Sequence, residues 1–204
     1  MPSYADVEEP SASLLVRLKR RDEKAFNELV IAYEQKVYRL VWRMLASREE
    51  AEDMTQEVFV QVFKNIEHFR GDSKLSTWIY RIAVNQTRNR SKYLTRRKHK
   101  SHSDISSDEG SLLHNEAQGI TTGETSRPDQ VAMGKQAERI VVDCLAELEP
   151  SFREILVLRD VECLSYEEVG AITGLAAGTV KSRLHRARVL LKTEVELRLG
   201  GPIQ

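Results

Sequence analysis

Apolar residues recur every three or four positions along most of this 204-residue chain, and that spacing favours helices over strands. Met54, Val58, Val62 and Ile66 stand four apart, so on a helix they would form one buried stripe. A similar apolar run follows Asp22, and no alternating pattern typical of strands competes with either run. The chain is therefore predicted to be all-α.

Short polar signals mark where these helices begin and end. The stretches Ser47-Arg48-Glu49-Glu50 and Ser165-Tyr166-Glu167-Glu168 each predict a capping box, in which serine oxygen and glutamate carboxylate satisfy backbone amides reciprocally. Pro150 is expected to end one helix and open the next. The short helix after Ser165 is expected to stop near Gly174.

One segment, residues 99–134, has no sustained apolar period. It is rich in Ser, Thr, Gly and acidic residues, which bury too little apolar area to offset the entropy of ordering the chain. We predict a flexible linker there. It would divide a helical domain at residues 13–98 from a second helical domain at residues 135–198.

The charges balance overall at 31 basic and 31 acidic side chains, but they are segregated along the chain. Residues 70–100 hold ten basic and one acidic side chain, and residues 177–193 hold five basic and no acidic ones. Residues 136–176 hold three basic and nine acidic ones. Two separate basic segments in a neutral chain predict two surfaces that face polyanions.

The composition disfavours several classes of protein. Cys144 and Cys163 are far apart, so neither a disulfide framework nor a zinc site is expected, and a reducing compartment is favoured. No signal peptide or membrane-spanning run is found, so the protein is expected in the cytoplasm. His99 and His102 have metal-ligand chemistry but lie in the polar linker, and no metal or cofactor is predicted.

The second basic segment predicts a helix-turn-helix. A short capped helix, a glycine-containing turn and the stretch GTVKSRLHRARVLLK at residues 178–192 follow one another. Its apolar residues share one helix face, whereas its cations share the other; the apolar ones are Val180, Leu184, Ala187 and Leu191. A helix fits the major groove of DNA, where Arg can bind guanine. A merely solubilising helix would mix both signs of charge.

The first basic segment differs because aromatic and amide side chains are interleaved with its cations. Aromatic rings stack on unpaired bases, cations contact phosphates, and amides bind base edges, so the combination favours single-stranded DNA. The aromatic residues are Phe69, Trp78, Tyr80 and Tyr93, and the amides are Asn85, Gln86 and Asn89. For Trp78, core packing and base contact both remain open.

Four motifs closely resemble those of bacterial RNA polymerase sigma factors. They are DMTQEVFVQVFKNI, FRGDSKLSTWIYRIAVN, LSYEEVGAITG and GTVKSRLHRAR, and they occur in the family's order. The extracytoplasmic-function (ECF) subfamily keeps only regions two and four. The resemblance identifies residues 13–98 with region two and residues 135–198 with region four.

The resemblance implies roles for particular residues. Polymerase-binding residues on the clamp helices of the beta-prime subunit would be Asp53, Gln56, Glu57, Val60 and Lys64. Residues that capture the unpaired minus-ten strand would be Phe69, Trp78, Tyr80, Asn85, Arg88 and Asn89. Residues on the minus-thirty-five duplex would be Thr179, Lys181, Ser182, Arg183, His185, Arg186 and Arg188.

Within the last group, the base-edge contacts are expected from Ser182, His185 and Arg186, and the phosphate contacts from Lys181, Arg183 and Arg188. The resemblance also implies the beta flap of polymerase and an anti-sigma factor as partners. It implies no catalytic residues, because the polymerase performs the chemistry.

Two positions depart from the family pattern. Family members often have Ser, Pro or Asp ahead of Gly-Thr-Val, whereas Ala176-Ala177 provides no side-chain cap for the last helix. The usual Gly-Asp before the first long helix is Arg21-Asp22.

Two other classes of protein would require features that this sequence lacks. A DNA-binding response regulator would need a receiver domain with strands, and a hydrolase would need a nucleophile or a carboxylate dyad; neither feature is found. The charge pattern raises one further hypothesis. Residues 70–100 carry a net +9 (10 minus 1) and residues 136–176 a net −6 (3 minus 9), so the two domains would close on each other in the free protein and cover the DNA-binding faces.

Overall fold

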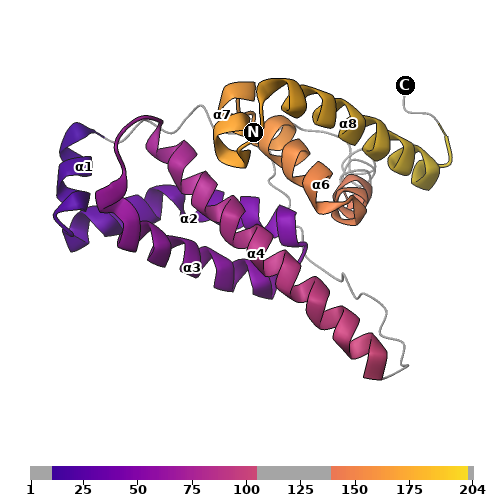
Figure 1. Cartoon of the computed structure of the whole chain (residues 1–204), viewed down its shortest axis with the longest axis horizontal. Coiled ribbons are helices and arrows are strands. Elements are labelled where there is room, and N and C mark those ends of the chain that lie inside the picture. The colour runs from indigo at the N-terminus through magenta and orange to yellow at the C-terminus, as the bar shows by residue number, and fades with distance from the viewer. Residues whose placement is uncertain (1–10, 105–138, 202–204) are drawn as a thin grey trace, which may run out of the picture.

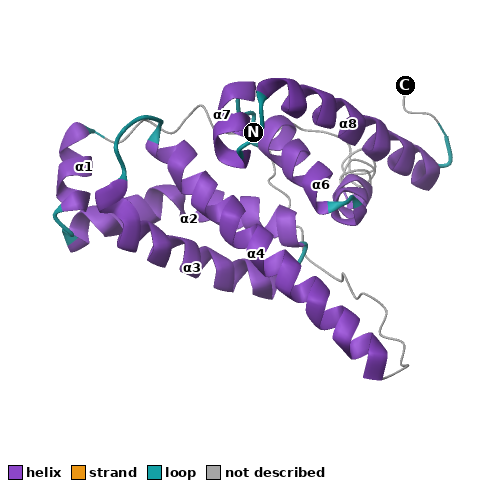
Figure 2. Cartoon of the chain, in the orientation of Figure 1, coloured by secondary structure: helices purple, strands orange, loops and turns teal. Residues whose placement is uncertain are grey.

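The computed structural model describes residues 11–104 and 139–201, and every regular element within those ranges is a helix (Figures 1 and 2). The N-terminal domain contains α1 (Ala12–Lys19), α2 (Glu23–Leu45), α3 (Arg48–Asn65), η2 (Ile66–His68) and α4 (Leu75–Asp104). The C-terminal domain contains a helical segment at 139–147, α6 (Pro150–Leu156), the π-helical turn η3 (Val157–Val161), α7 (Tyr166–Thr173) and α8 (Ala177–Leu199). The all-α prediction is confirmed.

The predicted linker lies mostly outside the described residues. Only its first part, up to residue 104, is described, and there α4 continues as a helix beyond the boundary predicted at residue 98. Figure 1 shows this end of α4 projecting past the other helices of the N-terminal domain.

The core of the N-terminal domain lies where α2, α3 and α4 pack side by side (Figure 1). The predicted stripe of Met54, Val58, Val62 and Ile66 is buried along α3, η2 included, with each side chain at most 3% exposed. Each fully buried side chain of this kind contributes roughly 1.5–3 kcal/mol of hydrophobic stabilisation. The four-residue spacing therefore fixes which face of α3 turns inward and which stays on the surface.

The two predicted capping boxes have different outcomes. At Ser165 both bonds form: the hydroxyl accepts from the Glu168 amide at 3.1 Å, and the Glu168 carboxylate accepts from the Ser165 amide at 2.9 Å. At Ser47 only one forms, from the Glu50 amide to the hydroxyl at 3.4 Å. The predicted second bond is wrong because the Glu50 carboxylate accepts instead from the Arg90 guanidinium of α4.

The turn between α1 and α2 contains a residue in the left-handed region. Arg21 has φ 60°, a conformation that favours glycine, which explains why a glycine would be usual there. Its Nε donates to Glu67 at 2.8 Å, and its guanidinium lies 5.4 Å from the centre of the Phe63 ring. These contacts join the turn to the end of α3 and offset the backbone strain.

In the C-terminal domain, α8 packs on α6 and α7. The predicted inward face is confirmed for Val180, Leu184 and Ala187, which are at most 1% exposed, whereas Leu191 is half-buried. Gly174 ends α7 with φ 75°, which only glycine adopts without strain. Pro150 is the first residue of α6, as predicted.

A single guanidinium organises the start of this domain. Arg153 of α6 donates to the carbonyl oxygens of Leu145, Ala146 and Leu148. The first two lie in the last turn of the helical segment 139–147, and Leu148 directly follows that segment. Arg153 Nη1 also donates, at 2.8 Å, to the carbonyl of Met44 in the last turn of α2. These carbonyls lie at helix ends, where the usual intrahelical amide partners run out, although Leu145 also accepts from the Leu148 amide at 3.3 Å. Arg153 therefore caps two helix ends at once.

Candidate nucleic-acid interface

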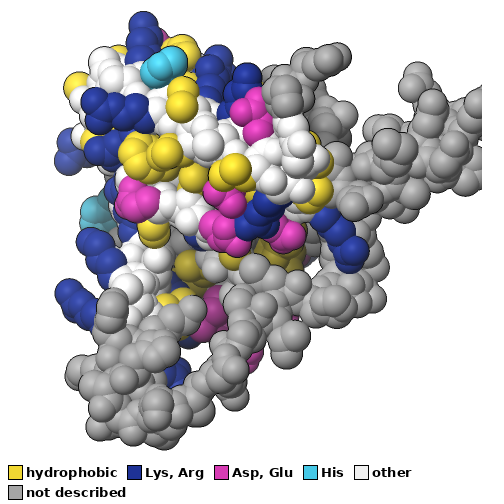
Figure 3. Space-filling model, turned by 90° about the vertical axis from the view of Figure 1, so that its right-hand side faces the viewer, with side chains coloured by type: hydrophobic (Ala, Val, Ile, Leu, Met, Phe, Trp, Pro, Cys, Tyr) yellow, Lys and Arg dark blue, Asp and Glu magenta, His cyan; other side chains and the backbone are white. Residues whose placement is uncertain are grey.

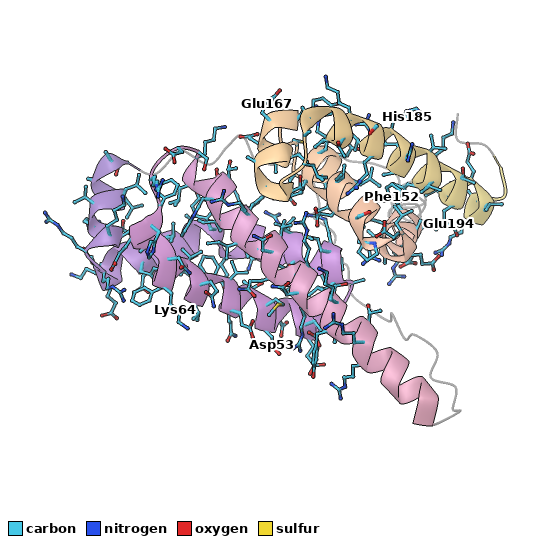
Figure 4. All side chains as sticks on the ribbon, viewed as in Figure 1. Asp53, Lys64, Phe152, Glu167, His185 and Glu194 are labelled. Atoms are coloured by element: carbon cyan, nitrogen blue, oxygen red, sulfur yellow. The ribbon has the colours of Figure 1, made fainter. Side chains whose placement is uncertain are left out.

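The outward face of α8 carries most of the residues predicted to contact duplex DNA. Thr179, Lys181, Ser182, His185, Arg186 and Arg188 are exposed, and Arg183 is half-buried. Figure 4 shows His185 on α8. The face contains no carboxylate between residues 177 and 193. On the face of the molecule drawn in Figure 3, Lys and Arg side chains gather along the upper and left edges, whereas Asp and Glu gather near the middle.

The two helices of the helix-turn-helix are held together around an aromatic ring. Tyr166, the first residue of α7, lies beneath the Lys181 ammonium, 5.4 Å from the ring centre. The Arg159 guanidinium lies 5.0 Å from the same ring. Such cation–aromatic contacts contribute about 0.5–1 kcal/mol at exposed sites. The contact with Lys181 joins the first turn of α8 to the first residue of α7.

The start of α8 has no side-chain cap, as predicted from Ala176-Ala177. Ala176 is the N-cap residue, and no side-chain oxygen accepts a bond from the first amides of the helix. Ser182 instead donates its hydroxyl to the Thr179 carbonyl at 3.1 Å. Amides at an uncapped helix start are suited to an anionic partner, because they carry the positive end of the helix dipole.

Arg188 differs from the other cations of α8. Its Nε and Nη2 donate to the two carboxylate oxygens of Asp160 at 2.9 and 2.5 Å. This pairing raises the pKa of Arg188 above its ordinary value. Contact with a phosphate would require Arg188 to leave Asp160, whereas Arg186 is exposed and is not paired in this way within the described ranges.

In the N-terminal domain, the candidate site is a polar cavity of about 390 Å³ between α3 and α4. Two predicted minus-ten residues, Trp78 and Asn85, line it. The rest of its lining is formed by Gln61, Asn65, His68, Arg81, Ile82 and Gln86. An aromatic ring, amides and a cation around one hollow are groups that bind the edges and face of a flat polar ring.

Sequence reasoning missed the α3 side of this cavity. Gln61 and Asn65 are four apart on α3, so they share a face, and Asn65 Nδ2 donates to the Gln61 carbonyl at 2.8 Å. Their spacing was visible in the sequence. What was not visible is that this face of α3 turns toward Trp78 and Asn85 on α4.

The remaining minus-ten residues lie in other surroundings. Phe69 is 4% exposed and its ring centre lies 5.5 Å from that of Trp78, so both rings pack in the core. Core packing is therefore confirmed for Trp78, which also lines the cavity, whereas base contact by this residue stays a prediction. Tyr80 is fully buried, with its hydroxyl facing Glu162 at 3.3 Å. In this arrangement of the two domains, Tyr80 therefore has no exposed surface to offer to DNA.

Arg88 and Asn89 complete the predicted set. Arg88 is half-buried and pairs with a carboxylate of the C-terminal domain, whereas Asn89 is exposed on α4.

The predicted polymerase-binding residues form one exposed stripe on α3. They are Asp53, Gln56, Glu57, Val60 and Lys64, and all five are exposed, with Val60 at 49%. The stripe lies opposite the buried face of Met54, Val58 and Val62. Figure 4 shows Asp53 and Lys64 along the side of α3 that faces away from the C-terminal domain.

These two helical domains, one with a basic helix-turn-helix and one with a polar cavity, are of the sigma-70 class. Residues 29–99 match the family model described as Sigma-70 region 2, and residues 138–191 match the one described as Sigma-70, region 4. Together the two matches cover most of both predicted domains.

Similar proteins of assigned function identify the subfamily within the sigma-70 class. The chain is 35% identical over 185 residues to the ECF RNA polymerase sigma-E factor of Haemophilus influenzae, covering 90% of this chain and 94% of that protein. It is 36% identical over 184 residues to the ECF RNA polymerase sigma-E factor of Escherichia coli K12, covering 90% and 93%. The chain belongs to the ECF RNA polymerase sigma factors.

Solved structures agree with the fold. The sigma factor RpoE of Bartonella quintana, in complex with the anti-sigma factor NepR, matches with a TM-score of 0.63 at 22% identity, covering 85% of this chain and 98% of that one. CnrH in complex with the cytosolic domain of CnrY matches with a TM-score of 0.61 at 19% identity, covering 91% and 96%. Across the described residues, no helix is long and apolar enough to cross a membrane.

Proposed function

We propose that this sigma factor binds core RNA polymerase in the cytoplasm and directs it to promoters through two separate DNA contacts. The C-terminal domain binds the minus-thirty-five duplex, and the N-terminal domain holds an unpaired base of the minus-ten strand. The observation that carries the proposal is the acid-free outward face of α8 on a helix-turn-helix.

In the duplex contact, the exposed Ser182, His185 and Arg186 bind base edges, and Lys181 and Arg183 neutralise phosphates. The uncapped amides at the start of α8 add a further phosphate contact. Thr179 lies beside those amides. Arg188 contributes once its bond with Asp160 is exchanged for a phosphate.

In the single-strand contact, a flipped base enters the cavity between α3 and α4. Trp78 offers part of a ring for stacking, and Asn85 and Asn65 offer amide groups to the base edge. Arg81 and the exposed Asn89 lie on the path of the backbone, and Phe69 supports Trp78 from the core. Tyr80 is left out of this contact because it is buried.

Polymerase is held through the exposed stripe on α3, which docks on the clamp helices of the beta-prime subunit, and through a contact of the C-terminal domain with the beta flap. Val60 gives the stripe an apolar centre between charged and amide side chains, which is typical of a protein-binding surface. An anti-sigma factor is the proposed regulator, in line with the partners of the solved sigma factors that share this fold.

Reconstitution tests the proposal. Purified protein is mixed with core polymerase and a library of promoter sequences, and the 5′ ends of the transcripts are sequenced. We expect defined start sites downstream of a common pair of sequence elements, and no defined start sites with core polymerase alone. Transcripts that start at random, or that are the same with and without the protein, would overturn the proposal.

A further inference from the structure

Asp160 faces the basic segment of α8 from another element of the same domain. It belongs to η3, the π-helical turn between α6 and α7 (Figure 1). Arg188 Nε and Nη2 donate to its two oxygens at 2.9 and 2.5 Å, so the carboxylate occupies one whole edge of the guanidinium. Such a forked pair fixes the direction of the arginine side chain as well as its partner.

A hydrogen-bonded turn presents this carboxylate. The Glu162 amide donates to the Val157 carbonyl at 2.9 Å, which closes the turn. Arg159, directly before Asp160, donates from Nη1 to the Leu164 carbonyl at 3.1 Å. Turns of this wide type are rare and occur mostly singly, often at functional sites. Because backbone acceptors close the turn, it forms without help from the Asp160 carboxylate.

Among the cations predicted to contact phosphates, Arg188 alone is matched by a carboxylate in the described part of the chain. Lys181 lies over the Tyr166 ring, which adds no negative charge beside it. Arg183 has no ion pair within the same residues. The domain therefore offers duplex DNA two cations without a counter-ion, and a third whose counter-ion is built in.

The pair lies where a phosphate could replace the carboxylate. Arg188 follows Lys181 by seven positions, so both side chains leave α8 on the same side, two turns apart. The Arg188 side chain is 52% exposed and that of Asp160 is 32% exposed, so a competing anion can reach the pair. Exposed ion pairs favour the paired form by at most about fivefold, which leaves this one open to exchange.

The exchange depends on how firmly a phosphate is held in place. With the correct duplex, base contacts fix α8 in the groove and so fix the phosphates that flank it. With unrelated duplex, only the attraction between cations and phosphates holds the complex, and the tethered carboxylate competes with phosphates that have no fixed position. A neutral pair also attracts a phosphate less than a bare guanidinium does.

We propose that Asp160 is a positioning residue that withholds Arg188 from duplex DNA of unrelated sequence and yields it to a promoter phosphate. The carboxylate thereby widens the margin between promoter and other DNA, and it lowers promoter affinity only slightly. The proposal rests on the proposed duplex contact of α8 for its partner, although not for the pair itself.

The test uses Asp160→Asn in the full-length protein. The amide keeps the size of the side chain and removes its charge, and Asp160 is exposed, so stability in urea should change no more than for a surface substitution. The matched control is Glu147→Gln. It makes the same change of charge in the same domain and weakens the pairing of another arginine of α8, Arg198, beyond the basic segment. The double variant Asp160→Asn with Arg188→Ala shows whether an effect passes through Arg188.

Fluorescence anisotropy gives the affinity of each variant for two labelled duplexes at several salt concentrations. One duplex contains the minus-thirty-five element found by reconstitution, and the other has the same bases in shuffled order. We expect Asp160→Asn to bind the shuffled duplex about fivefold more tightly, with a slope of log affinity against log salt that is steeper by about one unit. For the promoter duplex the gain should be smaller and the slope nearly unchanged, because Arg188 already contacts a phosphate there. Glu147→Gln should match the parent protein, and the double variant should lose both gains.

Unchanged affinity and slope of Asp160→Asn on the shuffled duplex would overturn the proposal. An equal gain in Glu147→Gln or in the double variant would also do so, because the effect would then be one of net charge. Equal gains on both duplexes would mean that the carboxylate does not discriminate, and weaker binding would mean that Asp160 braces Arg188 against a phosphate; either result refutes the proposal.

The same measurements separate this proposal from the proposed function. If the parent protein favours the promoter duplex while Asp160→Asn behaves as the parent does, only the role of Asp160 is wrong. If the parent does not distinguish the two duplexes and Arg186→Ala leaves its binding unchanged, the proposed duplex contact is wrong, and the role of Asp160 falls with it.

Discussion

The substitution Arg186→Ala should change which promoters are used more than how strongly DNA is bound. Arg186 is exposed, and no hydrogen bond or ion pair holds it within the described part of the chain, so its loss should alter folding stability by less than about 0.5 kcal/mol. A forked contact from Arg to guanine contributes about 1–3 kcal/mol of discrimination. That range corresponds to about a 5- to 150-fold preference for the correct base.

The assay is initiation by reconstituted polymerase from one promoter and from its single-base variants across the minus-thirty-five element. With Arg186→Ala, the preference at one or two base positions should fall toward equality while the other positions keep theirs. Arg188→Ala is the matched control. Because Arg188 is already bound by Asp160, its loss should weaken all variants alike and only slightly.

The salt dependence separates the two roles further. Loss of a phosphate contact lowers the slope of log affinity against log salt by about one unit, whereas loss of a base contact need not change it. If Arg186→Ala reduced initiation from every variant by one common factor, with the slope falling by one, Arg186 would be a phosphate ligand and the assignment of base contacts on α8 would be refuted.

Three other substitutions test separate parts of the molecule. Gln56→Ala should weaken binding to core polymerase in a fluorescence assay without changing thermal stability, because the side chain is exposed; the exposed amide variant Gln35→Ala is its control, and equal affinities for both would contradict the docking stripe. Leu184→Ala should lower the free energy of unfolding in urea by about 2–5 kcal/mol, because the side chain is buried beneath α8, and a loss below about 1 kcal/mol would mean that this face of α8 is not packed. Burial raises the pKa of Glu162 despite the opposing effect of Arg43, so folding takes up a proton there. Its contribution to stability is then full below the unfolded pKa of about 4.3 and falls as pH rises through the folded pKa. The free energy of unfolding of Glu162→Gln should therefore increase relative to that of the parent as pH rises through the folded pKa. If the two free energies, measured in urea, differ by a constant amount from pH 4 upward, the direction assigned to this pKa shift is wrong.

Local patterns in the sequence were enough to predict most helices and their ends. The four-residue spacing from Met54 to Ile66 predicted the buried face of α3, and Ala176 predicted the uncapped start of α8. Both features depend only on residues a few positions apart. The outward cations of α8 followed from the same reasoning, because a helix with one apolar stripe has one possible exposed face.

Contacts between distant residues could not be predicted in the same way. Glu50 was expected to cap its own helix, but Arg90, forty positions further on, binds its carboxylate. Tyr80 fits the pattern of a base-stacking residue, yet its ring is buried and its hydroxyl faces Glu162. The segregation of charge indicated that the two domains attract each other, but not which side chains meet. Such pairings depend on how helices are placed in space, which the spacing within each helix does not determine.

Arg153 of the C-terminal domain caps the end of α2 in the N-terminal domain. The carbonyl of Met44 would otherwise be left to water, but it is bound by a guanidinium from the other domain that is also tied to three carbonyls of its own. A lysine ammonium has three N–H donors on one nitrogen, so it could not bind these four carbonyls as the five N–H donors of a guanidinium do. Only the bond to Met44 crosses between the domains, whereas the bonds to Leu145, Ala146 and Leu148 lie within the C-terminal domain, so separating the domains would require only the Met44 carbonyl to exchange Arg153 for water.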